Sequence, residues 1–278
     1  MKLLKIIMCA AVALMTVVSC SPKKEAPKSK VLVLYYSQTS NTKTVAQEIA
    51  TRLDADIEEI SLVEPYDTAF QATIERCKAD REKGILPEIK PLKANIADYD
   101  WIFIGYPIWF GTYAPPIASL LEKVDLSGKW VVPFCTFGSG GLESSAKDLT
   151  GKQPNAKVMP GYGVRAARMD AMPAEVESFL KTIGLIEGGV FVPADFPEQH
   201  PVSADEAAIF DAAVNGYPML NAKATSVASR TVIDGTEYLF TAMDKPREDK
   251  PDMPPASEIK VYVIVEKGKA PEFTRVVR

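Results

Sequence analysis

An alternation of apolar runs with helix-like segments constrains the fold of this 278-residue chain more than any other feature. Runs such as VLVLYY and WIFIGY are typical of strands buried on both faces of a parallel sheet. Alternating strands and helices place helices over both faces of such a sheet. The sequence therefore predicts an α/β fold, a doubly wound five-stranded parallel sheet with strands from residues 30–37, 56–63, 98–107, 128–137 and 155–164.

The helices between these strands are indicated by apolar residues spaced three and four apart. Residues 41–53 carry such a stripe, and Pro115 and Pro116 suit the first turn of another helix. Residues 142–149 and 174–185 supply two more. We expect these four helices to cover the sheet.

The connection between the second and third strands, residues 64–97, is long. Phe70, Ile74 and Cys77 share a helical face within it, so we expect an extra helix laid over one edge of the sheet. A mobile lid is the alternative interpretation of so long a connection.

The pattern changes after about residue 190. Residues 189–203 hold three prolines and are typical of a linker, and residues 204–214 form a candidate helix. Alternating segments then flank Asp234-Gly235, a pair typical of a hairpin turn. We expect residues 204–278 to form a small α+β module of one helix and an antiparallel sheet.

The first residues, MKLLKIIMCAAVALMTVVSC, have the pattern of an export signal: a basic start, a short apolar stretch and small residues before Cys20. This pattern resembles a bacterial lipoprotein signal, which implies a signal peptide of residues 1–19, a lipid on Cys20 and a tether of residues 20–29. Simple cleavage that leaves an ordinary thiol is the alternative. We expect an exported protein anchored to a membrane by its lipid, on the periplasmic or the cell-surface face.

The net charge and the histidine content exclude several classes of function. The chain has 32 Lys and Arg against 36 Asp and Glu, a net charge of −4, which argues against nucleic acid as a partner. Its single His argues against zinc sites with several imidazoles and against Ser-His-Asp catalysis. An enzyme of this composition is expected to rely on a cofactor.

Residues 37–44, SQTSNTKT, crowd seven hydroxyl or amide side chains between the first strand and the first helix. The N-terminus of a helix presents unpaired N–H groups and a partial positive charge, so it suits a phosphate. Helix capping by Ser40 or Asn41 is the alternative. Because a cap needs only one such side chain, we favour phosphate binding.

Two further loops follow strand ends. Residues 105–116, GYPIWFGTYAPP, offer Trp109 and Phe110 for stacking on a planar ring, although one of the two is expected to fold back into the core. Residues 135–145, CTFGSGGLESS, are rich in glycine, so their backbone can approach a ligand closely. All three loops are expected at the carboxyl edge of the sheet, where ligands bind in open sheets of this kind.

Together these loops resemble those of the flavodoxin-like family, and residues 30–188 are similar to a flavodoxin-like domain. The resemblance implies that the cofactor is FMN, bound by three sets of residues. They are Ser37, Thr39, Asn41 and Thr42 at the phosphate, with Ser40 in the same loop; Pro107, Ile108, Trp109, Phe110 and Gly111 along the flavin ring; and Thr136, Gly138, Ser139 and Gly140 at the opposite rim.

Ser40 departs from the family pattern, because that position usually holds glycine. A serine with positive φ costs about 1–3 kcal/mol of strain, which would weaken FMN binding. No long insertion interrupts the fifth strand, so the domain resembles the short-chain type of this family. The sequence has no second glycine-rich loop that could bind the additional nucleotide of FAD, so FMN is expected rather than FAD. Residues 204–278 faintly resemble a cystatin-like fold, with Thr231 where that family's hairpin motif has Gln.

The resemblance implies an oxidoreductase. We expect electron transfer or flavin-mediated reduction at a membrane face, with a redox partner protein or a quinone-like acceptor. An NAD(P)H-dependent quinone or FMN reductase is one alternative. A non-redox interaction lipoprotein with a degenerate flavin site is another, from a different class of protein.

Overall fold

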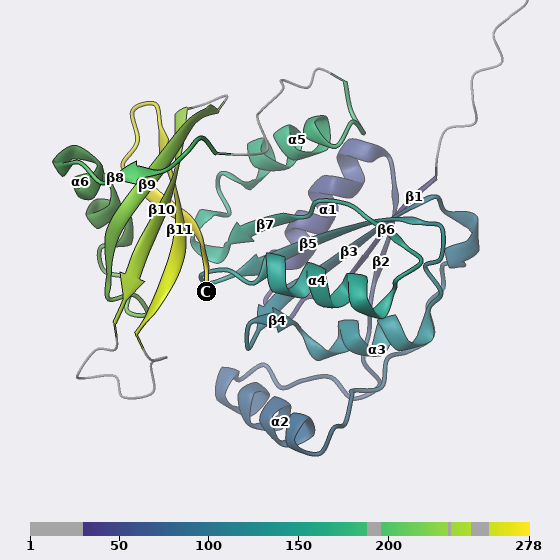
Figure 1. Ribbon diagram of the computed structural model, residues 1–278. Helices are drawn as coiled ribbons and strands as arrows, with labels where there is room; N and C mark the ends of the chain where they lie inside the picture. Colours follow the sequence, from purple (N-terminus) through teal and green to yellow (C-terminus); the bar gives the residue numbers. More distant parts are fainter. Residues whose placement is uncertain (1–29, 188–195, 233–234, 246–255) are drawn as a thin grey trace, which may run out of the picture.

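The computed structural model describes residues 30–187, 196–232, 235–245 and 256–278. The predicted signal peptide, Cys20 and the tether lie outside these residues, as do residues 189–195 of the predicted linker. Figure 1 shows two sheets side by side, one mostly parallel and one antiparallel. Across the described ranges, every helix is too short or too polar to span a lipid bilayer.

The parallel sheet has the order β2-β1-β3-β5 followed by β6, with β7 also pairing with β5. Its strands are β1 (Val31–Tyr35), β2 (Asp56–Glu59), β3 (Trp101–Trp109), β5 (Trp130–Phe137), β6 (Lys157–Val158) and β7 (Tyr162–Arg165). The short β4 (Thr112–Tyr113) pairs antiparallel with the end of β3. The strand order reverses between β1 and β3, which leaves a crevice at the carboxyl ends of these strands.

The fifth strand is divided, whereas the sequence predicts one run over residues 155–164. β6 and β7 pair with different parts of β5 and are separated by Pro160 and Gly161. Proline has no N–H to donate to a ladder, so a continuous strand is interrupted there.

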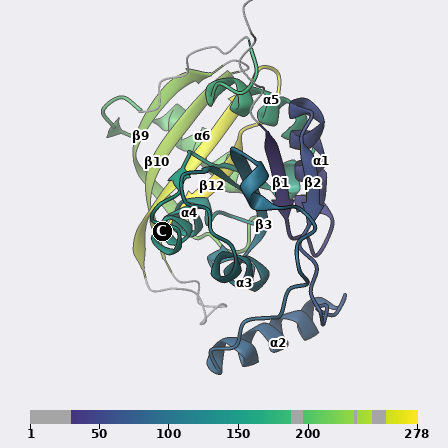
Figure 2. The ribbon, with the colours of Figure 1, turned by 90° about the vertical axis from the view of Figure 1, so that its right-hand side faces the viewer.

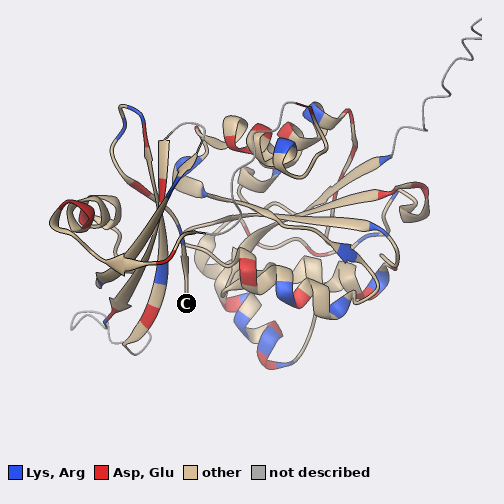
Figure 3. Cartoon of the chain, turned by 45° about the horizontal axis from the view of Figure 1, so that its top comes forward, with Lys and Arg blue, Asp and Glu red and all other residues tan. Residues whose placement is uncertain are grey.

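Helices cover both faces of the parallel sheet, which confirms the predicted doubly wound class. α1 (Asn41–Leu53) and α5 (Met172–Thr182) pack on one face, and α3 (Pro115–Lys123) and α4 (Leu142–Lys152) on the other. Leu32 and Leu34 are buried toward α3 and α4, whereas Val33 is buried toward α1 and α5. Acidic and basic residues are interspersed along the helices that flank the parallel sheet (Figure 3).

The predicted extra helix is α2 (Phe70–Glu82), and a short 3-10 turn (Ile96–Asp98) precedes β3. Both ribbon views show α2 standing apart from the helices that cover the sheet (Figures 1 and 2). Only Thr73 and Cys77 of this helix are buried.

The second sheet has the order β12-β11-β10-β9-β8, and the expected small α+β module is present. Its elements are β8 (His200–Pro201), α6 (Ala204–Val214), β9 (Ala222–Val232), β10 (Gly235–Asp244), β11 (Ser257–Glu266) and β12 (Glu272–Val277). Val232 pairs with Gly235 across the predicted hairpin, and β8 lies within the predicted linker. α6 covers the side of this sheet that faces away from the parallel sheet (Figure 1).

Candidate functional site

A cavity of about 380 Å³ opens at the carboxyl edge of the parallel sheet. Its walls come from the loop after β1, the ends of β3 and β5, and α2. The volume lies within the range of small-molecule sites. Seven of the sequence-predicted site residues line it: Thr39, Asn41, Pro107, Ile108, Trp109, Phe110 and Thr136.

Ser40 precedes α1 with a left-handed backbone, at φ 69°. Its side chain makes no capping hydrogen bond to the helix. Its carbonyl oxygen accepts from the N–H of Thr44 at 2.9 Å and from the Thr44 hydroxyl at 3.1 Å. The positive φ is the condition under which a serine in place of glycine stores strain.

The N–H groups at this corner are available to a ligand. Within the described ranges, no acceptor is found for the N–H groups of Thr39, Ser40, Asn41 and Thr42. The one amide that a side chain of the corner satisfies is that of Lys43, which donates to the Ser37 hydroxyl at 3.2 Å. The start of α1 therefore offers a cluster of donors and the positive end of the helix dipole to an anion.

Thr42 connects this corner to the end of β5. It is 1% exposed, and its hydroxyl shares a hydrogen bond of 2.8 Å with the hydroxyl of Thr136. Ser37, Ser40 and Thr42, also predicted as site residues, are not among the residues that line the cavity. The Thr42–Thr136 bond holds the start of α1 against the neighbouring cavity wall.

Trp109 is the aromatic side chain that packs on the core. Its ring meets Tyr66 edge to face at 5.2 Å and Tyr36 at 6.0 Å. Phe110, by contrast, is 50% exposed. One of these two rings was expected to fold back into the core, and Trp109 does so while still lining the cavity.

Phe110 and Gly111 form the tight turn between β3 and β4. Their φ angles are 51° and 82°, and Trp109 pairs with Thr112 across the turn. Positive φ at both central residues is typical of a type I′ turn. Glycine adopts this conformation freely, whereas a left-handed phenylalanine is rare and strained.

The glycine-rich loop after β5 is turned toward the second sheet. Gly138, Ser139 and Gly140 lie outside the cavity lining. Ser139, Gly140 and Gly111 border a separate hollow at the junction with the antiparallel sheet. Thus β5 contributes Thr136 and Phe137 to the cavity, and the loop beyond it contacts the second sheet.

α2 supplies cavity residues that were not predicted as site residues from the sequence. Phe70, Thr73, Ile74 and Cys77 line the cavity from this helix. Burial raises the pKa of the Cys77 thiol, so it is neutral at pH 7. The apolar stripe of residues 70–77 was visible in the sequence, but its position beside the crevice was not. Ala166, which also lines the cavity, carried no sequence signal.

Comparisons with known proteins agree with this architecture. The sequence profile of the family described as Flavodoxin matches residues 30–178. A solved candidate flavoprotein from Bacteroides eggerthii DSM 20697 is 30% identical with a TM-score of 0.50, over 56% of this chain and 98% of that one. A flavoprotein from Lactobacillus acidophilus NCFM, solved in complex with FMN, is 27% identical with a TM-score of 0.44, over 49% of this chain and 93% of that one. Because the profile match spans more than half of its 278 residues, the chain belongs to the flavodoxin family.

Proposed function

We propose that this protein binds FMN in the cavity between the ends of β1 and β3 and acts as a redox protein at a membrane face. The observation that carries the proposal is the run of unpaired N–H groups at the start of α1, on a cavity bordered by Trp109. Membership of the flavodoxin family supports a flavin-binding function.

The residues present fit a phosphorylated flavin. The N–H groups from Thr39 to Thr42 and the partner-free side chains of Thr39 and Asn41 supply donors for a dianion, counted over the described residues. Lys43 is engaged elsewhere, since its Nζ lies 3.9 Å from Glu59. The phosphate would therefore be held by helix-end amides and hydroxyls rather than by a cation.

FMN, when bound, accepts and releases electrons one or two at a time. The chain's own residues would hold and orient it: Trp109 beside the ring, and Ile108 and Phe137 as apolar walls that exclude water. The strained Phe110–Gly111 turn would keep an exposed aromatic ring at the mouth. Electron exchange with a partner protein or a quinone-like acceptor, rather than with NAD(P)H, suits an exported protein because nicotinamides are scarce outside the cytoplasm.

Membrane attachment through a lipidated Cys20 is part of this proposal. Incorporation of radiolabelled palmitate that is lost in Cys20→Ala would support it. Labelling that persists in that variant, or no labelling of the wild type, would contradict it. The cystatin-like resemblance of residues 204–278 stays a prediction.

The flavin proposal is tested by titrating the full mature chain, freed of lipid by Cys20→Ala, with FMN and with riboflavin. We expect the protein to be yellow and to bind FMN roughly a hundredfold more tightly than riboflavin. Only FMN has a phosphate, which can accept about two charge-assisted hydrogen bonds from the start of α1. Colourless protein that FMN cannot titrate would overturn the proposal in favour of the interaction lipoprotein. Equal affinities would overturn the assignment of the phosphate corner.

A further inference from the structure

The glycine-rich loop of residues 138–141, here called the rim loop, joins cavity-lining Phe137 to the start of α4. The N–H of Val276, in β12 of the second sheet, donates to the carbonyl oxygen of Ser139 at 2.6 Å. A Cβ on Gly140 would lie 2.1 Å from the carbonyl oxygen of Val276, closer than any side chain allows. The second sheet is therefore packed backbone to backbone on the rim loop.

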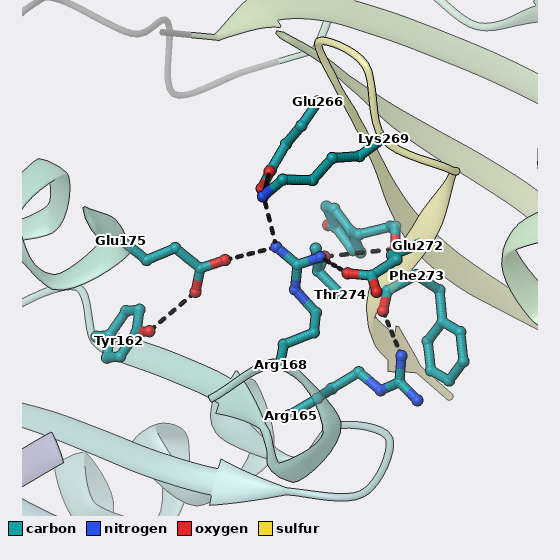
Figure 4. A network of polar contacts seen from close by, with 10 residues as sticks. Tyr162, Arg165, Arg168, Glu175, Glu266, Lys269, Glu272, Phe273 and Thr274 are labelled. Carbon is teal, nitrogen blue, oxygen red and sulfur yellow. Dashed lines mark hydrogen bonds and ion pairs between the residues drawn. The ribbon is translucent and has the colours of Figure 1, made fainter. Parts of the chain in front are cut away.

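Arg165 reinforces this contact by bonding both the rim loop and β12. It ends β7, where it pairs with Phe137 of β5. Its Nε donates to the carbonyl oxygen of Gly138 at 3.1 Å, and its Nη1 donates to that of Phe273 at 2.8 Å. The guanidinium also lies over the Phe273 ring, 3.5 Å from its centroid. One side chain thus joins the rim loop to β12, and Figure 4 shows its bond to Phe273.

Arg168, three residues further on, fastens the same segment to the second sheet. Only 4% of its side chain is exposed, and it contacts Glu175 at 2.8 Å, Glu266 at 3.4 Å, and Glu272 (Figure 4). Glu266 and Glu272 belong to the second sheet, whereas Glu175 belongs to α5. Separating the sheets would break the ion pairs of Arg168 with Glu266 and Glu272, whereas its pair with Glu175 would remain.

Ala166 lies between these two arginines and lines the cavity. The short segment from Arg165 to Arg168 therefore contacts the cavity, the rim loop and the second sheet. A displacement of β12 would act on the rim loop directly through Val276 and indirectly through Arg165.

We propose that the second sheet contributes to the flavin site, in which β12 and Arg165 hold the rim loop beside the cavity, next to the cavity-lining Phe137. Arg165 is a positioning residue for FMN. This inference rests on the proposed function and deepens it, because it makes flavin binding and the docking of the second sheet thermodynamically coupled.

Arg165→Lys in the full mature chain tests the inference, because lysine keeps the charge but cannot bridge two carbonyl groups with a planar fork. Arg52→Lys is the matched control: Arg52 bonds Glu48, Glu177 and the carbonyl oxygen of Pro173, away from the rim loop. We expect Arg165→Lys to speed hydrogen exchange of rim-loop amides in FMN-free protein, and to raise the Kd for FMN about tenfold. Arg52→Lys should leave both unchanged.

Val276→Pro provides a second, independent variant, since it deletes the N–H that donates a hydrogen bond to the carbonyl oxygen of Ser139. Val276→Ala truncates the same side chain but keeps that N–H, so only the proline variant is expected to release the loop. Thermal unfolding of each variant establishes that it is folded.

Rim-loop exchange and FMN affinity that match the wild type in both Arg165→Lys and Val276→Pro would overturn the inference. A wild type that does not bind FMN would overturn the proposed function and with it the flavin role of Arg165. The exchange rates in FMN-free protein would then still decide whether β12 and Arg165 hold the loop, so the two failures are distinguishable.

Discussion

Ser40 combines a left-handed backbone with a hydroxyl that makes no capping bond to α1. The sequence indicated the conflict, since serine stands where the family has glycine. Only the φ angle of 69° shows that the residue adopts the strained conformation. Strain of this kind is often found at functional sites.

Ser40→Gly is expected to stabilise the protein by about 1 kcal/mol, the relieved strain less the greater freedom of glycine in the unfolded chain. This corresponds to a rise in Tm of roughly 2–4 °C, measured by thermal unfolding. Ser37→Gly is the control and is expected to lower the Tm, because it removes the hydroxyl that accepts a hydrogen bond from the Lys43 N–H. A lower Tm in Ser40→Gly would contradict the account of strain.

Trp109→Leu is expected to weaken FMN binding by about ten- to a hundredfold, because leucine fills space but offers no ring on which a flavin can stack. Trp130→Leu is the matched control: Trp130 stacks on Trp101 at 5.3 Å, at the opposite end of the strands. Fluorescence titration with FMN measures both. Equal losses in the two variants would exclude a stacking role for Trp109.

Among the elements, α2 is the most weakly attached wall of the cavity. Its only buried residues are Thr73 and Cys77, and Phe70 at its start is 79% exposed. A helix that buries so little apolar surface opens at low free energy. It is therefore suited to admitting a ligand.

Hydrogen exchange should be faster in α2 than in α1 in FMN-free protein, and FMN should slow it in α2 through contacts with the cavity-facing Thr73, Ile74 and Cys77. Mass spectrometry of peptides from the two helices measures the difference. Exchange in α2 that is insensitive to saturating FMN would show that this helix does not contact the ligand.

The bounds of several elements could be predicted because local pattern and tertiary burial agree. α1 was predicted over residues 41–53 and α6 over residues 204–214, and both are observed there. In α6 the Ser203–Glu206 capping box adds a local start signal. The division of the fifth strand was missed because an apolar run masked the effect of Pro160 on pairing.

At the scale of the whole molecule, the contact between the rim loop and β12 could not be predicted from the sequence. It joins Ser139 and Val276 through backbone atoms, which leave no side-chain pattern. Gly140 was explained as a means of approaching a ligand, whereas the structure shows it approached by β12. Close backbone packing and ligand binding select the same residue, so glycine alone does not distinguish them.

Acid is expected to lower the stability of the protein through Glu266, which contacts Arg168 across the junction between the sheets. The hydrogen bond from Lys269, with added attraction from Lys269 and Arg168, holds the pKa of Glu266 below its ordinary value of 4.5. A pKa that is lower in the folded state contributes stability above the unfolded value and loses it as the pH falls through the folded value. Tm should therefore fall more steeply with acidification below about pH 4.5 in the wild type than in Glu266→Gln. Parallel curves would contradict a contribution from Glu266.

A parallel sheet has two unlike ends, and in this chain the candidate cavity lies at the carboxyl end. Lys30 enters β1 at the end opposite the cavity, and β1 spans about 16 Å at 3.3 Å per residue. A lipid anchor ahead of Lys30 would attach the protein to the membrane at the end of β1 opposite the cavity. The opening of the cavity would then face away from the membrane. Electrons would then be exchanged with molecules arriving from the aqueous side, and a carrier dissolved among the acyl chains would have to leave the bilayer to reach the flavin.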